Sequence, residues 1–298
     1  MKRTLYSLTF CSFLLAALGL AWTGPAGASD HKDKPRREGI LLAAFGTTVP
    51  EAQKAMDKME ARVKAAFPGL PVRWAYTSKI VRDKLAAQGH VFDSPEVALA
   101  RMADEGFTKI GVMSLHTIPG EEYTELARTV RAASDFSERP RVVISDPLLH
   151  DAEDMDKALA AILAVIPKER QPSEAVVLMG HGTPHPANVY YMGLQYLLSK
   201  KAPGVFVGTV EGSPTLRDVQ AELKAGGFKT VWLMPFMSVA GDHALNDMAG
   251  AEDDSWKSIL TKAGHDCRPV LKGTAEYDEF GDLWVEHLKR AMADRKHP

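Results

Sequence analysis

The stretch ILLAAFGT, residues Ile40–Thr47, is matched later in the chain by VVLMGHGT, residues Val176–Thr183. Each is a continuous apolar run that ends in Gly-Thr, and such runs are typical of strands buried on both faces of a parallel sheet. A second pair of similar stretches follows at Ile110–Glu122 (IGVMSLHTIPGEE) and Val231–His243 (VWLMPFMSVAGDH). The repetition predicts two halves with the same architecture.

Strand-like runs alternate with helical patterns along the chain between residues 38 and 272. Helical spacing is clear from Pro50 onward, where apolar residues recur every three or four positions. The predicted strands are Gly39–Phe45, Val72–Tyr76, Ile110–Leu115, Arg141–Ile144, Ala175–Met179, Val205–Val210, Val231–Met234 and Arg268–Leu271. The alternation predicts an α/β fold with two similar domains, each a parallel sheet flanked by helices.

The predicted domains span residues 38–168 and 172–272. A last helix, residues 275–294, carries one apolar stripe (Phe280, Leu283, Trp284, His287 and Leu288) and is expected to pack across both domains. Ligands of open α/β sheets bind beyond the carboxyl ends of the strands, so a cleft between the domains is the expected site.

The first 28 residues have the features of a secretory signal peptide. Lys2 and Arg3 precede an apolar run, and Ala26-Gly27-Ala28 forms a cleavage site before Ser29. An uncleaved membrane anchor is the alternative, because the apolar run approaches the ~20 residues that span a bilayer. We therefore expect a periplasmic protein that begins near Ser29, with Cys267 as its single thiol and no internal disulfide.

Charge and motifs exclude several functions. Cleavage would leave 34 of the 36 basic side chains against 38 acidic ones, a formal charge of −4, which argues against nucleic acid as a partner. The sequence contains no GxxxxGK[ST], GxGxxG, GxSxG or HExxH motif, so nucleotide, hydride-transfer and serine-hydrolase chemistry are disfavoured.

Three potential metal ligands follow predicted strands of the second half. His181 lies in GHGTPHPAN, Glu211 in VEGSP and His243 in SVAGDHALND. Two imidazoles and a carboxylate suit Co²⁺, Fe²⁺, Ni²⁺ or Zn²⁺ and leave positions open for an exchanging ligand. Taken alone, each has an ordinary alternative: a loop histidine is commonly a surface group, and Glu211 could stabilise a helix N-terminus.

Longer motifs resemble the anaerobic cobaltochelatases of the CbiK type, which are class II chelatases. They are HTIPGEEY (116–123), MGHGTPHPAN (179–188), VEGSPTLRDV (210–219) and LMPFMSVAGDHALNDMAG (233–250) with DDSWK (253–257). The resemblance runs from GILLAAFGTT to about Leu271. It implies two α/β domains facing a cleft, and ATP-independent insertion of Co²⁺, often also of Fe²⁺, into sirohydrochlorin. The export signal is a departure, because members of this family are usually cytoplasmic.

The resemblance also implies roles for individual residues. The metal-binding histidines of the family fall on His181 and His243, and its metal-site glutamate on Glu211. Glu121 and Glu122 match residues that face the cleft from the first domain. A base must accept two pyrrole protons, and either of these glutamates, Glu211 or a histidine could do so.

The substrate is rich in carboxylates, so cations and backbone N–H groups are expected to bind it. Lys79 and Arg82 are the local cations proposed for this role, although the segment Thr77–Lys84 could equally be an amphipathic helix with solvated charges. The other substrate-binding candidates are Gly46, Thr47, His185 and Asp242.

Three functions remain open at this point. The first is an exported sirohydrochlorin cobaltochelatase, the second a sirohydrochlorin ferrochelatase, and the third a non-catalytic carrier of metal or tetrapyrrole. A homo-oligomer is expected. Whether another histidine, such as His116 beside the cleft, binds an accessory haem or metal is left open.

Overall fold

The computed structural model describes residues 36–135 and 140–293, which belong to one compact unit that starts at Arg36. The predicted signal peptide, residues 1–28, lies outside the described residues. Within the described ranges, none of the helices has the length and hydropathy needed to span a bilayer.

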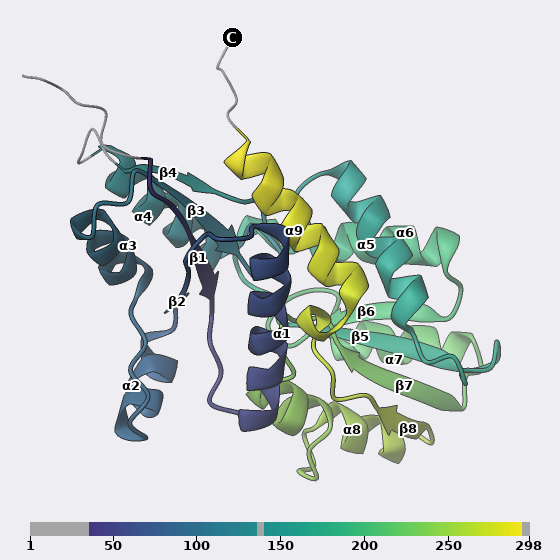
Figure 1. Ribbon diagram of the computed structural model, residues 1–298. Coiled ribbons are helices and arrows are strands. Elements are labelled where there is room, and N and C mark those ends of the chain that lie inside the picture. Colours follow the sequence, from purple (N-terminus) through teal and green to yellow (C-terminus); the bar gives the residue numbers. More distant parts are fainter. Residues whose placement is uncertain (1–35, 136–139, 294–298) are drawn as a thin grey trace, which may run out of the picture. The chain divides into compact units, whose positions relative to one another are not determined.

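Within the described residues, eight strands form two parallel sheets of four, and each of them overlaps a predicted strand (Figure 1). The first sheet has the order β2-β1-β3-β4 and consists of β1 (Glu38–Ala44), β2 (Val72–Tyr76), β3 (Lys109–Ser114) and β4 (Arg141–Ile144). The second has the order β6-β5-β7-β8 and consists of β5 (Ala175–Gly180), β6 (Val205–Thr209), β7 (Thr230–Pro235) and β8 (Asp266–Pro269). The two sheets thus share one strand order, as the sequence repeat predicts.

Helices connect the strands and cover both faces of each sheet. They are α1 (Pro50–Ala66), α2 (Lys79–Ala87), α3 (Pro95–Asp104), α4 (Glu121–Asp135), α5 (Ala152–Val165), α6 (Val189–Lys201), α7 (Leu216–Ala225), α8 (Trp256–Lys262) and α9 (Asp278–Met292). Short helical turns occur at Pro186–Asn188 (η1), Ala244–Met248 (η2, a π-helix) and Thr274–Glu276 (η3).

Alternate residues of the central strands contribute to different cores. In β1, Ile40 and Leu42 join one buried cluster, whereas Leu41 and Ala43 join another beneath α3 and α4. This alternation is the two-residue period of a strand buried on both faces, and it explains why β1 reads as a continuous apolar run.

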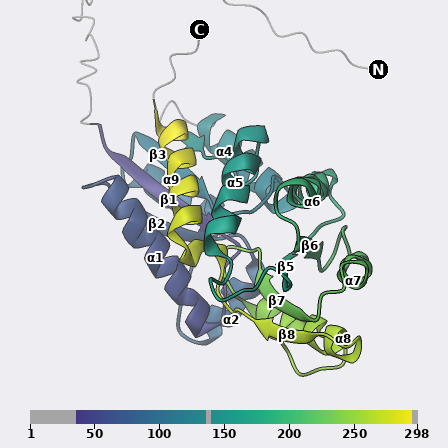
Figure 2. The same ribbon diagram turned by 90° about the vertical axis from the view of Figure 1, so that its right-hand side faces the viewer.

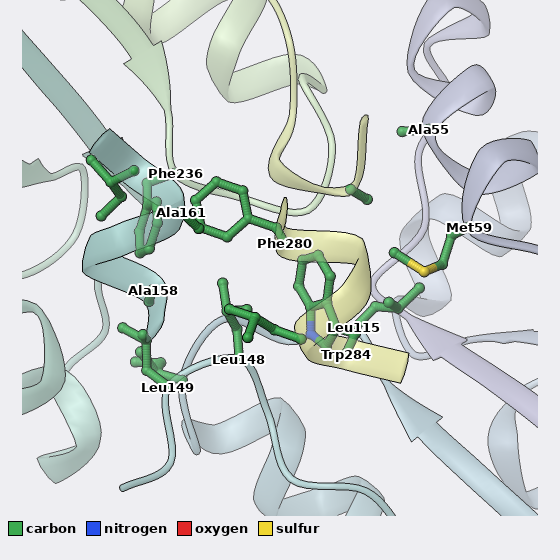
Figure 3. Packing of buried hydrophobic residues seen from close by; sticks show 14 of the residues in the cluster. Ala55, Met59, Leu115, Leu148, Leu149, Ala158, Ala161, Phe236, Phe280 and Trp284 are labelled. Carbon is green, nitrogen blue, oxygen red and sulfur yellow. The ribbon is translucent and has the colours of Figure 1, made fainter. Parts of the chain in front are cut away.

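The C-terminal helix α9 lies against α1 and α5 and covers β3 and β4 (Figures 1 and 2). Its predicted apolar stripe is buried, with Trp284 fully enclosed and Phe280 1% exposed. Phe280 also meets Phe236, which follows β7 of the second sheet, with ring centroids 6.0 Å apart (Figure 3). The largest core cluster therefore contains residues of both sheets.

Candidate functional site

A cavity of about 440 Å³ lies where the loops after β1, β3, β5 and β7 meet, a volume within the usual range of small-molecule sites. The residues that line it are Phe45, Gly46, Thr47, Thr48, Ser78, Ile80, Val81, Lys84, Leu115, His116, Thr117, Ile118, Gly120, Glu122, His181, Gly182, Thr183, Tyr191, Met237, Ser238, Val239, Gly241, Asp242 and His243. Both halves of the repeat contribute to it, at the carboxyl ends of their strands, as predicted for ligand binding in an open α/β sheet.

His181 is held by the sharp turn that follows β5. Gly182 has a φ of +77°, and a Cβ atom there would approach the Gly212 nitrogen to 2.7 Å, so the turn requires glycine. The Nδ1 atom of His181 lies 2.8 Å from the carbonyl oxygen of Gly182. Because a carbonyl can only accept, Nδ1 carries the proton, and the lone pair of Nε2 is available to a metal.

His243 precedes the π-helix η2 and faces His181. The two rings meet edge to face, with centroids 4.8 Å apart and an interplanar angle of 84°. Nδ1 of His243 is bonded to a carboxylate oxygen of Asp247, four residues later. A carboxylate partner of this kind fixes the tautomer and orientation of a metal-binding imidazole. Asp247 was not among the residues predicted from the sequence, although its position four residues after His243 in GDHALND is a signal that could have identified it.

Glu211 does not line the cavity. Its backbone N–H donates to the carbonyl oxygen of His181 at 2.8 Å, but its side chain is exposed. Among the described residues, no group of three or more His, Cys, Asp or Glu side chains is close enough to hold a metal ion. The structure therefore brings His181 and His243 together without Glu211, whose role as a ligand stays a prediction.

Of the two glutamates predicted in the first half, Glu122 lines the cavity and Glu121 does not. Both begin helix α4, but the side chain of Glu121 is exposed to solvent. Gly46, Thr47 and Asp242 also line the cavity, and Thr47 is 6% exposed. Their role in substrate binding stays a prediction.

Three other predicted substrate-binding residues lie outside the lining. Lys79 forms an ion pair with Asp83, and the Arg82 guanidinium donates to the carbonyl oxygens of Tyr76 and Thr77. The Nδ1 atom of His185 accepts a hydrogen bond from the backbone of Ala187 at 3.2 Å, and so caps η1.

His116 lines the cavity and has an unsatisfied nitrogen. Its Nδ1 lies 2.9 Å from the hydroxyl oxygen of Ser114, whereas its buried Nε2 has no hydrogen-bond partner. Burial lowers the pKa of His116 to about 4, and the nearby carboxylate of Glu122 opposes this effect. The imidazole is therefore neutral at physiological pH, and its unpaired Nε2 atom is enclosed by the protein.

The arrangement suits the transfer of a divalent metal ion. The imidazoles of His181 and His243 provide ligands that bind borderline metals and can release them. Glu122, which enters the same cavity from the first half, provides a carboxylate that can accept protons.

Comparisons with known proteins show the family to which the chain belongs. A family model described as cobalt chelatase (CbiK) matches residues 38–293. The sirohydrochlorin cobaltochelatase CbiKC of Nitratidesulfovibrio vulgaris is 46% identical over 257 residues, 86% of this chain and 91% of that protein. The sirohydrochlorin cobaltochelatase of Salmonella typhimurium is 33% identical over 258 residues, 86% of this chain and 97% of that protein.

Solved structures show the same fold at lower identity. SirB from Bacillus subtilis, determined with Fe³⁺, has a TM-score of 0.58 and 17% identity, with 86% of this chain and 96% of that chain covered. CbiX, described as the terminal enzyme of siroheme biosynthesis in denitrifying bacteria, has a TM-score of 0.53 and 17% identity, with 86% and 100% covered. With the family model and both curated relatives covering most of its length, the chain belongs to the CbiK family of cobalt chelatases.

Proposed function

We propose that this protein inserts Co²⁺ into sirohydrochlorin and that His181 and His243 hold the incoming metal ion. The observation that carries the proposal is the pair of imidazoles at the cavity wall, each with one nitrogen engaged and the other available. The names of the two curated relatives support both the metal and the tetrapyrrole.

The reaction exchanges two pyrrole N–H protons for one divalent cation, so the charge of the macrocycle is unchanged. His181 and His243 would replace part of the water shell of the ion and then release it to the four ring nitrogens. Glu122 belongs to the first half of the repeat and lines the cavity, and its carboxylate would accept the two pyrrole protons. His116, whose imidazole is neutral and lines the cavity, would pack against the bound ring.

A visible-absorbance assay of the mature protein with sirohydrochlorin and Co²⁺ tests this function. We expect many turnovers above the non-enzymatic rate, without added nucleotide, and their loss in His181→Ala. A spectral change that saturates at about one equivalent in the wild-type protein would identify a carrier and contradict the proposal.

We further propose that Fe²⁺ is accepted by the same site. Imidazole and carboxylate ligands bind both Co²⁺ and Fe²⁺, so the ligand set does not separate the two metals. Anaerobic assays with each metal at equal free concentration would rank them. The proposal that both metals are used would be refuted if Fe²⁺ binds to the protein but is not inserted at any concentration tested.

We also propose that the protein is exported to the periplasm after cleavage before Ser29, on the basis of the charged start, apolar run and Ala26-Gly27-Ala28 site. N-terminal sequencing of protein recovered from the periplasmic fraction should begin near Ser29. An intact N-terminus on membrane-bound protein would instead identify an anchor.

Homo-oligomerisation remains a prediction, which light scattering of the mature protein would check.

A further inference from the structure

The three basic residues of helix α2 have different environments. Lys79 is paired with Asp83, and Arg82 is turned onto the carbonyl oxygens of Tyr76 and Thr77. Lys84 lines the cavity and forms no ion pair or hydrogen bond within the part of the chain that the structure describes. Of the three basic side chains of α2, Lys84 is therefore the one that is unpaired and lines the cavity.

Lys84 stands next to an apolar surface of the same cavity. Ile80 lies one helical turn earlier, on the same face of α2, and remains 69% exposed although it lines the site. Phe45, from the loop after β1, is 48% exposed beside the same cavity. Large apolar side chains left open at a cavity gain free energy when a flat apolar ligand covers them.

The charges of the lining residues make Lys84 distinctive. The carboxylates that line the cavity belong to Glu122 and Asp242. Among the described residues, Lys84 is the only lining side chain with a permanent positive charge. A ligand that carries several carboxylates would be repelled by the first two groups. An ammonium group with three donors can bind one carboxylate and so fix the rotation of the ring in the site.

We propose that Lys84 binds a peripheral carboxylate of the tetrapyrrole and that Phe45 and Ile80 cover the adjacent face of the macrocycle. This inference rests on the proposed substrate, sirohydrochlorin. It places the contacts with the organic substrate on the first half of the repeat, whereas the metal ligands come from the second half.

Titration of the protein with metal-free sirohydrochlorin, followed by tryptophan fluorescence, tests the contact without turnover. We expect Lys84→Ala to raise the Kd about tenfold, the usual effect of one charge-assisted hydrogen bond. Lys84→Arg should largely restore binding, and the dependence of Kd on salt should be weaker in Lys84→Ala than in the wild type. In the insertion assay the KM for sirohydrochlorin should rise with little change in kcat.

Lys224→Ala is the matched control. Lys224 is also an exposed lysine in the last turn of a helix, α7, and forms no ion pair or side-chain hydrogen bond within the described residues. Helix α7 follows β6 as α2 follows β2, but Lys224 does not line the cavity. Both lysines interact favourably with the C-terminus of their helices, so a merely structural role would give the two variants the same small loss of stability. Equal Kd values for Lys84→Ala, Lys224→Ala and the wild type would overturn the proposal. If wild-type protein binds sirohydrochlorin but does not insert metal, the proposed function is contradicted. The comparison of Kd values between Lys84→Ala and the wild type then still tests the Lys84 contact.

Discussion

At the scale of single residues, the two imidazoles are expected to account for metal binding. Each has its Nδ1 engaged, His181 by the Gly182 carbonyl and His243 by Asp247, so each presents Nε2. We predict that His181→Ala and His243→Ala each lower the affinity for Co²⁺ at least about 100-fold and abolish insertion. Calorimetric titration with Co²⁺ measures the affinity, and unchanged circular dichroism verifies the fold.

His265→Ala serves as the control for these variants. Its Nδ1 is bonded to the Phe228 carbonyl oxygen at 3.0 Å, away from the cavity, so its loss should leave Co²⁺ affinity unchanged. Affinity near that of the wild type in His181→Ala would remove the assignment of the metal ligands.

The buried imidazole of His116 should make folding stability depend on pH. Its pKa is lowered to about 4 by burial, whereas the unfolded chain takes up a proton near pH 6.5. The unfolded state therefore binds more protons between these values, and stability is lost as the pH falls from 6.5 towards 4. We predict that between pH 7 and pH 4 the wild type loses about 3 kcal/mol more free energy of unfolding than His116→Gln. Urea unfolding at several pH values measures this difference, and parallel curves would contradict it.

The sequence could predict His181 and His243 because strand ends and flanking glycines are local signals. The sequence also indicated His116 beside the cleft and the basic segment Thr77–Lys84. The structure was needed to single out Lys84 within that segment and the unpaired nitrogen of His116, because both depend on which neighbours leave a side chain unpaired. Lys79 and Arg82 were predicted to bind substrate because their charges suit a carboxylate-rich ligand. In the structure, Lys79 pairs with Asp83 and Arg82 donates to a backbone carbonyl oxygen, and neither interaction was predicted from the sequence.

At the scale of elements, the two halves place different chemistry on equivalent positions. The Ser78 N–H donates to the Phe45 carbonyl oxygen at 3.2 Å, just as the Glu211 N–H donates to that of His181 at 2.8 Å. Phe45 therefore occupies in the first half the place that His181 has in the second. In the aligned stretches after β3 and β7, Glu122 likewise corresponds to His243. Equivalent turns thus provide an apolar surface and a carboxylate on one side and metal ligands on the other.

The π-helix η2 is the element that aligns His243. Its wider turn, with an Ala249 N–H bond to the Ala244 carbonyl oxygen at 3.2 Å, follows directly after the histidine and contains Asp247. We predict that Asp247→Asn lowers Co²⁺ affinity by about tenfold, because a neutral amide fixes the tautomer of His243 less strongly. Calorimetric titration measures the loss. An unchanged affinity, with His243→Ala still inactive, would show that the carboxylate has no orienting role.

At the scale of the whole molecule, the repeat made the architecture predictable. All eight strands were expected because buried parallel strands are short apolar runs between helical patterns. Strand β8 was placed two residues too late, at Arg268–Leu271 instead of Asp266–Pro269, because this edge strand is half exposed and lacks an apolar run. The proposed boundaries of the two domains, residues 38–168 and 172–272, stay a prediction. The packing of side chains between the sheets could not be derived from local pattern at all.

That packing leads to a prediction about cooperativity. The largest core cluster contains Ile40 of β1, Val176 of β5 and Trp284 of α9, so the two sheets share one buried interior. Trp284 packs in it beside Phe280 and Leu115 (Figure 3). Removing the Trp284 side chain should destabilise the protein by about 3–5 kcal/mol. Because the cluster is shared, hydrogen exchange read by mass spectrometry should show equal loss of protection in β1 and β5.

Leu260→Ala, which truncates a separate cluster beneath the second sheet, should also lower protection in β1 if the unit unfolds as a whole. Loss confined to β5 would instead mean that the two sheets unfold independently, and the site between them would then depend on docking of two separately stable halves.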